Sequence, residues 1–211
     1  MKIINHKWVL MILLSVFVLS CKKDSETPIA SSSSANGNGG GGGGSGSGSG
    51  SISKTTAPEG TALGNAAYNF TGTDVMTGNS FTLNSTLGKY TIIDVWGINC
   101  PNCELVSPTF LELLSNPTYA GKLTLVGLAC YNGTQPNTNN MLAEANKVKM
   151  NNYPQLNDGN SAITSRLYSN SSGSFSLPLV ILVDPSGKIV YQGTGYGTGS
   201  EIKTYLKNNL K

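Results

Sequence analysis

Two cysteines separated by two residues, Cys100-Pro101-Asn102-Cys103, follow an apolar and β-branched run from Tyr90 to Trp96. The run predicts a buried strand, and the proline directly after Cys100 predicts the start of a helix, because proline is favoured at the first helical position. A Cys-x-x-Cys pair between a strand and a helix is typical of a redox motif. The chain must therefore fold so that a strand delivers two cysteines to a helix N-terminus.

The spacing of Cys100 and Cys103 allows a disulfide within the first turn of the helix. Free N–H groups and the helix dipole stabilise a thiolate on Cys100, whereas Cys103 lies one turn further in and is expected to be shielded. Cys100 should therefore attack a substrate disulfide, and Cys103 should resolve the mixed disulfide. A zinc site would need a second Cys or His pair, but the domain offers only Cys130, which we expect to pack in the core. No metal site is expected.

Asp94 lies six residues before Cys100, within the apolar run. It could be the exposed acid of an edge strand, but the neighbouring Ile92, Ile93 and Val95 favour burial. A buried carboxylate beside a thiol has a raised pKa and can act as a base. We therefore expect Asp94 to assist the cysteine chemistry.

The remaining patterns predict an α/β domain over residues 61–211, with a central mixed sheet flanked by helices. Besides residues 90–96, strands are expected at 80–83, 122–129, 153–156, 179–183 and 189–191, and helices at 100–115, 140–150, 161–168 and 200–210. The last two strands should form a hairpin, since Asp184-Pro185-Ser186-Gly187 has proline second and glycine fourth, as a type I turn prefers.

The N-terminal 60 residues have a different character. Residues 1–20 have basic residues ahead of a short apolar run, which is too short to span a bilayer and is typical of a secretory signal peptide. The end of this run, Leu19-Ser20-Cys21, resembles the bacterial lipobox, which predicts a lipid on Cys21 and attachment to a membrane through it. An ordinary signal peptide or an uncleaved anchor is the alternative. Residues 21–60 are rich in Ser, Gly and Asn, and we expect a disordered tether.

Charge and histidine content exclude two classes of function. The formal net charge of +3 includes Lys2 and Lys7 of the predicted signal, so no strongly basic field remains to bind nucleic acid. The single histidine, His6, lies in the same segment, and a mature chain without histidine cannot use it for acid–base chemistry or metal binding. We expect no cofactor.

Several of these motifs together resemble the thioredoxin superfamily, and specifically its redoxin-like TlpA-type envelope thiol-disulfide oxidoreductases. Those proteins have an apolar strand that ends in Trp, then a W-C-x-x-C motif and a proline five residues past the second cysteine. Here Trp96, Cys100, Cys103 and Pro108 are similar, although Asn99 replaces the usual aromatic before the first cysteine. Residues 69–89 resemble the N-terminal hairpin and helical turn of the family, and residues 176–190 resemble its G-x-P-T-x-x-x-I-D-x-x-G-x-I-V segment.

The resemblance covers about residues 67–211 and implies a thioredoxin-like fold. It implies that Pro178 is a cis-proline facing the disulfide, where extended substrates pair, with Trp96, Pro101 and Leu177 at the substrate surface; Leu177 departs from the usual small or β-branched residue. It also implies disulfide-bearing protein substrates and a membrane-bound electron donor in the bacterial cell envelope, facing the periplasm rather than the cell surface.

Two other functions could use the same scaffold. A thiol peroxidase on this scaffold would resemble P-x-x-x-T-x-x-C, but Gly97 stands at the threonine position. A non-catalytic surface lipoprotein is the second alternative, because a fold does not fix function.

The residues around Cys100 predict the direction of the reaction. Pro101 and Asn102 are neutral and no Lys or Arg lies between Lys89 and Lys122, so the helix dipole is the main expected stabiliser of the Cys100 thiolate. This predicts a reductant.

Overall fold

The computed structural model describes residues 53–210, so the predicted signal peptide, Cys21 and most of the predicted tether lie outside the described residues. The elements follow one another as β1 (Thr71–Thr73), β2 (Ser80–Thr82), η1 (Leu83–Thr86), β3 (Tyr90–Gly97), α1 (Pro101–Ser115), η2 (Pro117–Tyr119), β4 (Leu123–Cys130), α2 (Thr138–Lys147), β5 (Gln155–Asp158), α3 (Thr164–Leu167), β6 (Leu179–Val183), β7 (Ile189–Thr194) and α4 (Thr198–Asn209). Within residues 53–210, no helix has both the length and the apolar character needed to cross a bilayer.

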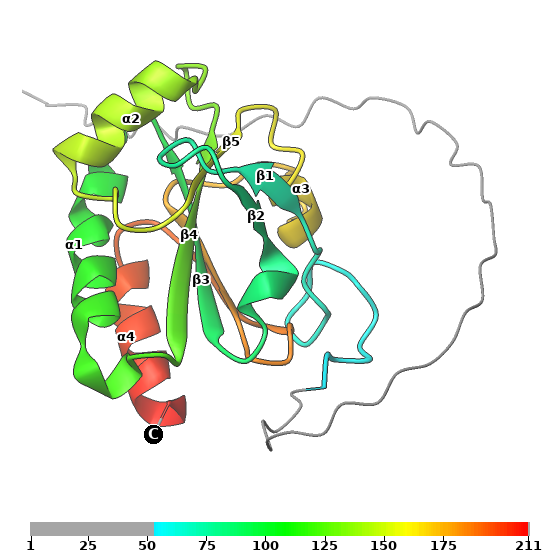
Figure 1. Cartoon of the computed structure of the whole chain (residues 1–211). Helices are drawn as coiled ribbons and strands as arrows, with labels where there is room; N and C mark the ends of the chain where they lie inside the picture. The colour runs from blue at the N-terminus through cyan, green and yellow to red at the C-terminus, as the bar shows by residue number, and fades with distance from the viewer. Residues whose placement is uncertain (1–52, 211) are drawn as a thin grey trace, which may run out of the picture.

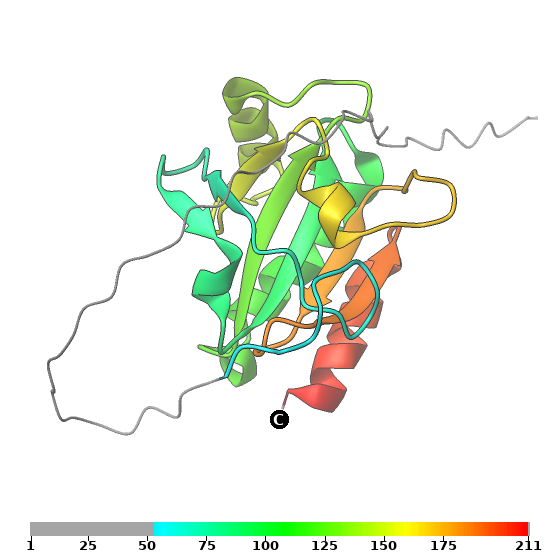
Figure 2. The ribbon, with the colours of Figure 1, turned by 90° about the vertical axis from the view of Figure 1, so that its right-hand side faces the viewer.

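A five-stranded mixed sheet in the order β5-β4-β3-β6-β7 forms the centre of the domain. Strands β3, β4 and β5 run parallel, whereas β6 and β7 run antiparallel to their neighbours. Helices α1, α2 and α4 cover one face (Figure 1), and the β1–β2 hairpin and α3 lie over the other (Figure 2). The predicted α/β fold with a central mixed sheet is confirmed.

Burial on both faces explains the composition of the central strands. A strand covered on both sides is a nearly continuous apolar run rather than an alternating one. In β3 the side chains of Ile92, Ile93 and Val95 are all fully buried, and β4 and β6 flank this strand in the sheet. β3 therefore holds the central position that its sequence predicts.

Local capping and turn residues set the boundaries of the elements. α2 begins at Thr138, two residues before its predicted start, because Asn137 and Asn140 form a reciprocal capping box there. In the predicted turn after β6, the N–H of Gly187 donates to the carbonyl of Asp184 at 2.9 Å, and Gly187 has a φ of 93°. The turn between β6 and β7 is thereby confirmed.

The described residues ahead of the predicted boundary at Thr61 contact the domain. The N–H of Thr55 donates to the carbonyl of Ser186 at 2.8 Å, and Glu59 forms an ion pair with Arg166 at 2.6 Å. The part of the predicted tether from residue 53 to 60 is therefore attached to the domain. The sequence did not reveal this, because residues 53–60 have no periodic apolar pattern and the partner of Glu59, Arg166, lies 107 positions away.

Candidate active site

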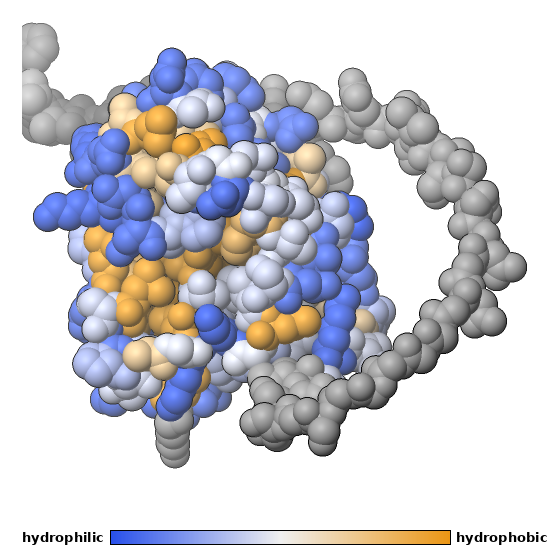
Figure 3. Space-filling model, in the orientation of Figure 1, coloured by the Kyte–Doolittle hydropathy of each residue, from blue (hydrophilic) through white to orange (hydrophobic). Residues whose placement is uncertain are grey.

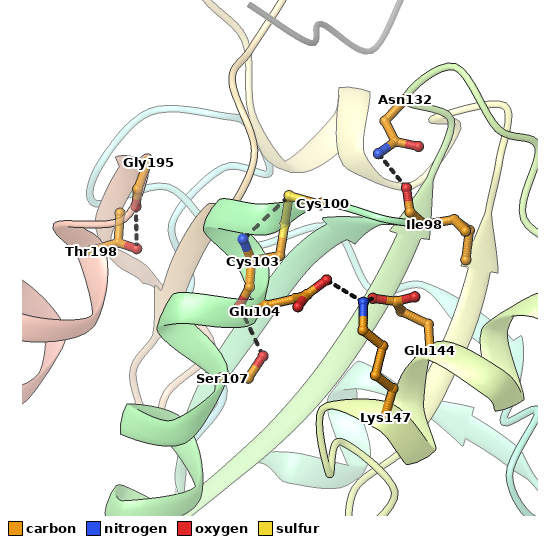
Figure 4. The surroundings of a disulfide bond; sticks show 10 residues. All are labelled: Ile98, Cys100, Cys103, Glu104, Ser107, Asn132, Glu144, Lys147, Gly195 and Thr198. Atoms are coloured by element: carbon orange, nitrogen blue, oxygen red, sulfur yellow. Dashed lines mark hydrogen bonds and ion pairs between the residues drawn. A yellow bond between two sulfur atoms is a disulfide. The ribbon is translucent and has the colours of Figure 1, made fainter.

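The cysteine pair lies where the central strand meets the first helix. Cys100 and Cys103 form a disulfide whose Cα atoms are 5.3 Å apart, at the start of α1 (Figure 4). β6 runs antiparallel to β3, and its first residue, Leu179, pairs with Val95. The preceding residue, Pro178, therefore lies at the same edge of the sheet as the cysteine pair. The fold thus brings together two motifs that are far apart in the sequence.

The two cysteines differ in their position on the helix. Cys100 is the N-cap of α1, and the backbone N–H of Cys103 donates to its sulfur at 3.3 Å. A sulfur that accepts an N–H bond at a helix N-terminus is the one whose thiolate is stabilised. Exposure does not separate the pair, because Cys100 is 6% and Cys103 is 5% exposed. The helix position is therefore the structural argument for Cys100 as the nucleophile.

An asparagine that the sequence analysis did not single out holds the loop before Cys100. The Asn132 side chain follows β4 and donates from Nδ2 to the carbonyl of Ile98 at 2.9 Å (Figure 4). Gly97 makes room for this contact, since a Cβ there would lie 2.4 Å from Cγ of Asn132. Asn99, which lies between Ile98 and Cys100, has a φ of 54°, a backbone conformation that asparagine tolerates better than most residues.

Pro178 has the geometry expected from the resemblance. The Leu177–Pro178 peptide bond is cis, and the carbonyl of Pro178 accepts a hydrogen bond from the N–H of Gly195 at 2.8 Å. Thr198, at the start of α4, donates from its hydroxyl to the carbonyl of Gly195 at 2.8 Å. The cis-proline is thus held by the turn between β7 and α4. Leu177 is buried, and its contact with substrate remains a prediction.

Trp96 requires a correction. We predicted that it contacts substrate, but its side chain is fully buried in β3, and its indole N–H donates to Oε1 of Gln155 at 3.0 Å. A side chain enclosed in this way packs the core behind the site and does not form the substrate surface. By contrast, Pro101 at the first position of α1 is exposed, and its contact with substrate remains a prediction.

Asp94 is buried, as its neighbours predicted. Its side chain is 2% exposed in the central strand, so it is not the acid of an edge strand. Oδ1 of Asp94 has no hydrogen-bond partner. Burial without compensating bonds raises the pKa of the Asp94 carboxyl to about 7. A carboxyl with this pKa can exchange a proton with a thiol near neutral pH.

A charged cluster beside the disulfide comes from two helices. Glu104 lies in the first turn of α1, and Lys147 of α2 forms an ion pair with it at 2.5 Å (Figure 4). Lys147 also lies 3.6 Å from Glu144, whose side chain is mostly buried. This lysine lies outside residues 89–122, and α2 brings it to the site from elsewhere in the chain, so the local sequence around the cysteines did not reveal it.

The third cysteine of the domain lies in the core. Cys130 is fully buried at the end of β4, where it pairs with Gly97 of β3 and Asp158 of β5 in the sheet. Among residues 53–210, no group of three or more Cys, His, Asp and Glu residues is placed to hold a metal ion.

Comparisons with known proteins agree with this geometry. The model of the Redoxin family matches residues 62–207. The thioredoxin domain of a thiol-disulfide oxidoreductase from Bacteroides vulgatus is similar at 25% identity and a TM-score of 0.57, over 71% of this chain and 99% of that one. A thiol:disulfide interchange protein from Bacteroides sp. is 26% identical, with a TM-score of 0.51 and coverage of 69% and 91%.

A third structure supports the fold alone. It is a thiol:disulfide interchange protein of the thioredoxin family from Chlorobium tepidum, with 22% identity, a TM-score of 0.59 and coverage of 71% of this chain and 99% of that one. No curated protein matches the chain. The matched segment contains the cysteine pair, the cis-proline and all five strands of the sheet. The chain therefore belongs to the Redoxin family, within the thioredoxin superfamily.

Proposed function

We propose that the protein is a thiol-disulfide oxidoreductase that reduces disulfides of envelope proteins through Cys100 and Cys103. The observation that carries the proposal is the hydrogen bond from the Cys103 N–H to the Cys100 sulfur at the N-terminus of α1. This contact, together with the helix dipole, favours a thiolate on Cys100 in the reduced protein. Membership of the Redoxin family supports oxidoreductase chemistry in general.

The proposed reaction transfers two electrons from the dithiol to a substrate. The Cys100 thiolate attacks one sulfur of the substrate disulfide, whose S–S bond breaks and releases the first substrate thiolate. The Cys103 thiol then loses its proton to the Asp94 carboxylate and attacks the Cys100 sulfur of the mixed disulfide. The second substrate thiolate leaves and takes up a proton, and the Cys100–Cys103 disulfide forms.

The reducing direction is proposed from the groups around Cys100. The intervening Pro101 and Asn102 are neutral, and the nearby Lys147 is already paired with Glu104. The helix N-terminus therefore remains the main stabiliser of the thiolate, and a less stabilised dithiol has a lower reduction potential. We expect a potential nearer the roughly −270 mV of thioredoxin than the roughly −120 mV of the strong oxidant DsbA.

An exposed apolar side chain beside the dithiol supports a protein substrate. Leu105 of α1 is 67% exposed and lies two residues after Cys103. Figure 3 shows that hydrophobic surface gathers over the part of this face formed by α1 and α2. A substrate that presents apolar side chains next to its disulfide, as an incompletely folded protein does, would match this surface.

Two assays test the proposed function. The full chain in detergent should reduce insulin disulfides with dithiothreitol as the electron source, and a Cys100→Ser variant should be inactive. Equilibration with glutathione buffers should give a potential below about −180 mV, the value for protein disulfide isomerase. Absence of insulin reduction would favour a non-catalytic binding protein, and a potential above that value would make the protein an oxidase or isomerase.

A peroxidase is disfavoured by the packing around Gly97. The threonine of the peroxidase motif would need a side chain at this position. A Cβ on Gly97 would lie 2.4 Å from Cγ and 2.8 Å from Cβ of Asn132, closer than van der Waals contact allows. Asn132 would have to give up its bond to Ile98 to make room.

We further propose that a lipid on Cys21 anchors the protein in the bacterial cell envelope, facing the periplasm. An oxidising compartment requires that a reductant be recharged, and a lipid anchor would keep the domain close to a membrane-bound electron donor. Intact-mass analysis of the membrane fraction should find a chain that begins at an acylated Cys21. An unmodified soluble chain would contradict the anchor.

A further inference from the structure

The side chain of Asn132 links the segment after β4 to the loop that leads to Cys100. Asn132 comes two residues after the end of β4, and its Nδ2 donates to the carbonyl of Ile98 at 2.9 Å (Figure 4). Ile98 is two residues before Cys100. The contact is enclosed, since Asn132 and Ile98 are each 6% exposed. A buried hydrogen bond therefore holds the main chain just ahead of the dithiol.

The count of buried polar atoms shows that this amide adds little to the stability of the fold. Its Nδ2 pairs one buried acceptor, the Ile98 carbonyl, but its own Oδ1 is buried and has no hydrogen-bond partner within residues 53–210. An apolar side chain of the same shape would leave the Ile98 carbonyl unpaired instead. The number of unpaired buried acceptors is the same in both cases, and each costs free energy. What the amide contributes is the position that its donor imposes on the Ile98 carbonyl.

The residues on either side of Ile98 fit this role. Gly97 leaves the space that the amide occupies, because a Cβ at Gly97 would lie 2.4 Å from Nδ2 of Asn132. Asn99 has a φ of 54°, in the left-handed region that costs free energy for a residue with a side chain. A backbone in this region keeps its conformation only where its surroundings hold it. The bond from Asn132 fixes the carbonyl directly before it.

The bond should matter more in the reduced protein than in the oxidised one. In the oxidised protein the Cys100–Cys103 disulfide itself ties the N-cap residue to the first turn of α1. Reduction breaks that covalent link, and the position of Cys100 then depends on non-covalent contacts alone. A hydrogen bond that holds the preceding loop keeps the two sulfurs close enough to rejoin. A dithiol held in this way loses less conformational entropy when its disulfide forms.

We propose that Asn132 is a positioning residue, whose bond to the Ile98 carbonyl holds the reduced Cys100 and Cys103 in the geometry of their disulfide and so lowers the reduction potential of the pair. This inference deepens the proposed function, and it rests on that function only in taking the pair as redox-active. It is separate from the effect of the helix dipole, which acts on the charge of the Cys100 thiolate and not on the distance between the two sulfurs.

The test is an Asn132→Leu variant of the full chain, which keeps the branched shape and removes the donor. In glutathione buffers, the equilibrium constant for forming the Cys100–Cys103 disulfide should fall about tenfold, which is a rise in potential of about 30 mV. The mixed disulfide of Cys100 with glutathione, through which the exchange passes, should become more abundant, because Cys103 displaces glutathione less effectively. Urea unfolding of the oxidised variant should give nearly the wild-type free energy, since one unpaired acceptor replaces another.

Gln192→Leu is the matched control, because Gln192 also donates from its side-chain amide to main-chain carbonyls. Its Nε2 bonds to the carbonyls of Thr61 and Leu167, each at 2.9 Å, and it lies on β7, which β6 separates from β3. Loss of these bonds should lower the free energy of unfolding but leave the glutathione equilibrium unchanged. Equal shifts of potential in both variants would show that general loosening of the domain is the cause, and would overturn the inference.

The difference in potential between variant and wild type separates this inference from the proposed function. A wild-type chain that fails to reduce insulin contradicts the proposed function, but the glutathione equilibrium still decides the role of Asn132. An unchanged or lowered potential in Asn132→Leu overturns the inference, whether or not the chain reduces insulin. If Asn132→Leu does not fold, Asn132→Ala removes the same donor without filling the space, and its potential should rise at least as far; an unchanged value there overturns the inference equally.

Discussion

Two aspartates of the same sheet are almost equally buried but have opposite surroundings. Asp158, at the end of β5, is 1% exposed and accepts hydrogen bonds from the N–H groups of Ile163 and Thr164 and from the Thr164 hydroxyl. Asp94, in β3, is 2% exposed, and its Oδ1 accepts none. Asp158 holds the chain at the start of α3, whereas nothing in the packing of β3 requires a carboxyl group.

The contrast separates a structural acid from a chemical one. Burial raises the pKa of both carboxyls, but hydrogen bonds from Thr164 and the neighbouring backbone oppose that rise at Asp158. No such bonds oppose it at Asp94, whose pKa reaches about 7. A carboxyl that is buried at a cost and left unsatisfied, in the strand that leads to the cysteines, is suited to proton transfer.

A chemical role for Asp94 requires that the reaction takes place at the cysteine pair. Variants of the two cysteines test this requirement and should have the largest effect. Cys103→Ser should retain attack by Cys100 but lack the resolving thiol, so that substrates accumulate as mixed disulfides and turnover falls to background. Non-reducing gels and mass spectrometry would detect the trapped species. Cys100→Ser should trap nothing. If Cys100→Ser traps substrates instead, the roles of the two cysteines are reversed.

Asp94→Asn tests the chemical half of the comparison. The ionised carboxylate is the form that accepts a proton, so wild-type turnover should rise with pH through about 7. The variant should lose this rise and turn over about 100-fold more slowly near neutral pH, as is typical for loss of a general base. Stopped-flow measurement of mixed-disulfide resolution from pH 5 to 9 checks this. Identical pH profiles would remove Asp94 from the mechanism.

The same substitution should change the pH dependence of folding stability. Because the pKa of Asp94 is raised from its ordinary value of 3.8 to about 7, the folded state binds more protons than the unfolded state between these values. The contribution of Asp94 to stability should therefore be fully present below pH 4 and be lost as pH rises to 7. Asp94→Asn should remove that loss and be more stable than the wild type above pH 7, by up to about 4 kcal/mol. Urea unfolding at pH 4 and 8 measures it.

Asp158→Asn tests the structural half. The amide that replaces one carboxylate oxygen would place its own donor against the N–H and hydroxyl of Thr164, so we expect a loss of about 3 kcal/mol in the free energy of unfolding. The pH midpoint of turnover should stay where it is in the wild type. A pH midpoint of turnover that moves in Asp158→Asn would erase the distinction between the two acids.

Local sequence signals predicted most of the fold and the centre of the site. The β-branched run at residues 90–96 specified the central strand, Pro101 marked the first position of α1, and Gly187 marked the turn between β6 and β7. Each of these depends on neighbours in the chain. The cis geometry at Pro178 followed from a resemblance extending over many residues, not from the proline alone.

Contacts between distant segments could not be predicted in this way. The bond between Trp96 and Gln155 joins residues 59 positions apart, and the burial of Trp96 contradicted its predicted contact with substrate. Lys147 reaches Glu104 across 43 positions. Neither pair has a periodic pattern that would reveal its partner.

The smallest expected effect concerns the Glu104–Lys147 ion pair, which changes the electrostatic surroundings of Cys100 but takes no part in the thiol-disulfide reaction. The Glu104 carboxylate lies in the first turn of α1, where it opposes a thiolate on Cys100, and Lys147 offsets that charge. Glu104→Gln should therefore lower the pKa of Cys100, stabilise the dithiol and raise the reduction potential by about 10 mV, since partly exposed charges interact weakly.

The same helix provides a matched control for this prediction. Glu112 forms an ion pair of similar length, 2.6 Å, with Lys203 of α4, but it lies eight residues further along α1, about 12 Å along the helix axis. That distance exceeds the screening length at physiological salt, so Glu112→Gln should leave the potential unchanged. Glutathione equilibration of both variants decides the matter. Equal shifts in both would show that the total charge of α1 matters, and that the position of Glu104 beside the dithiol does not.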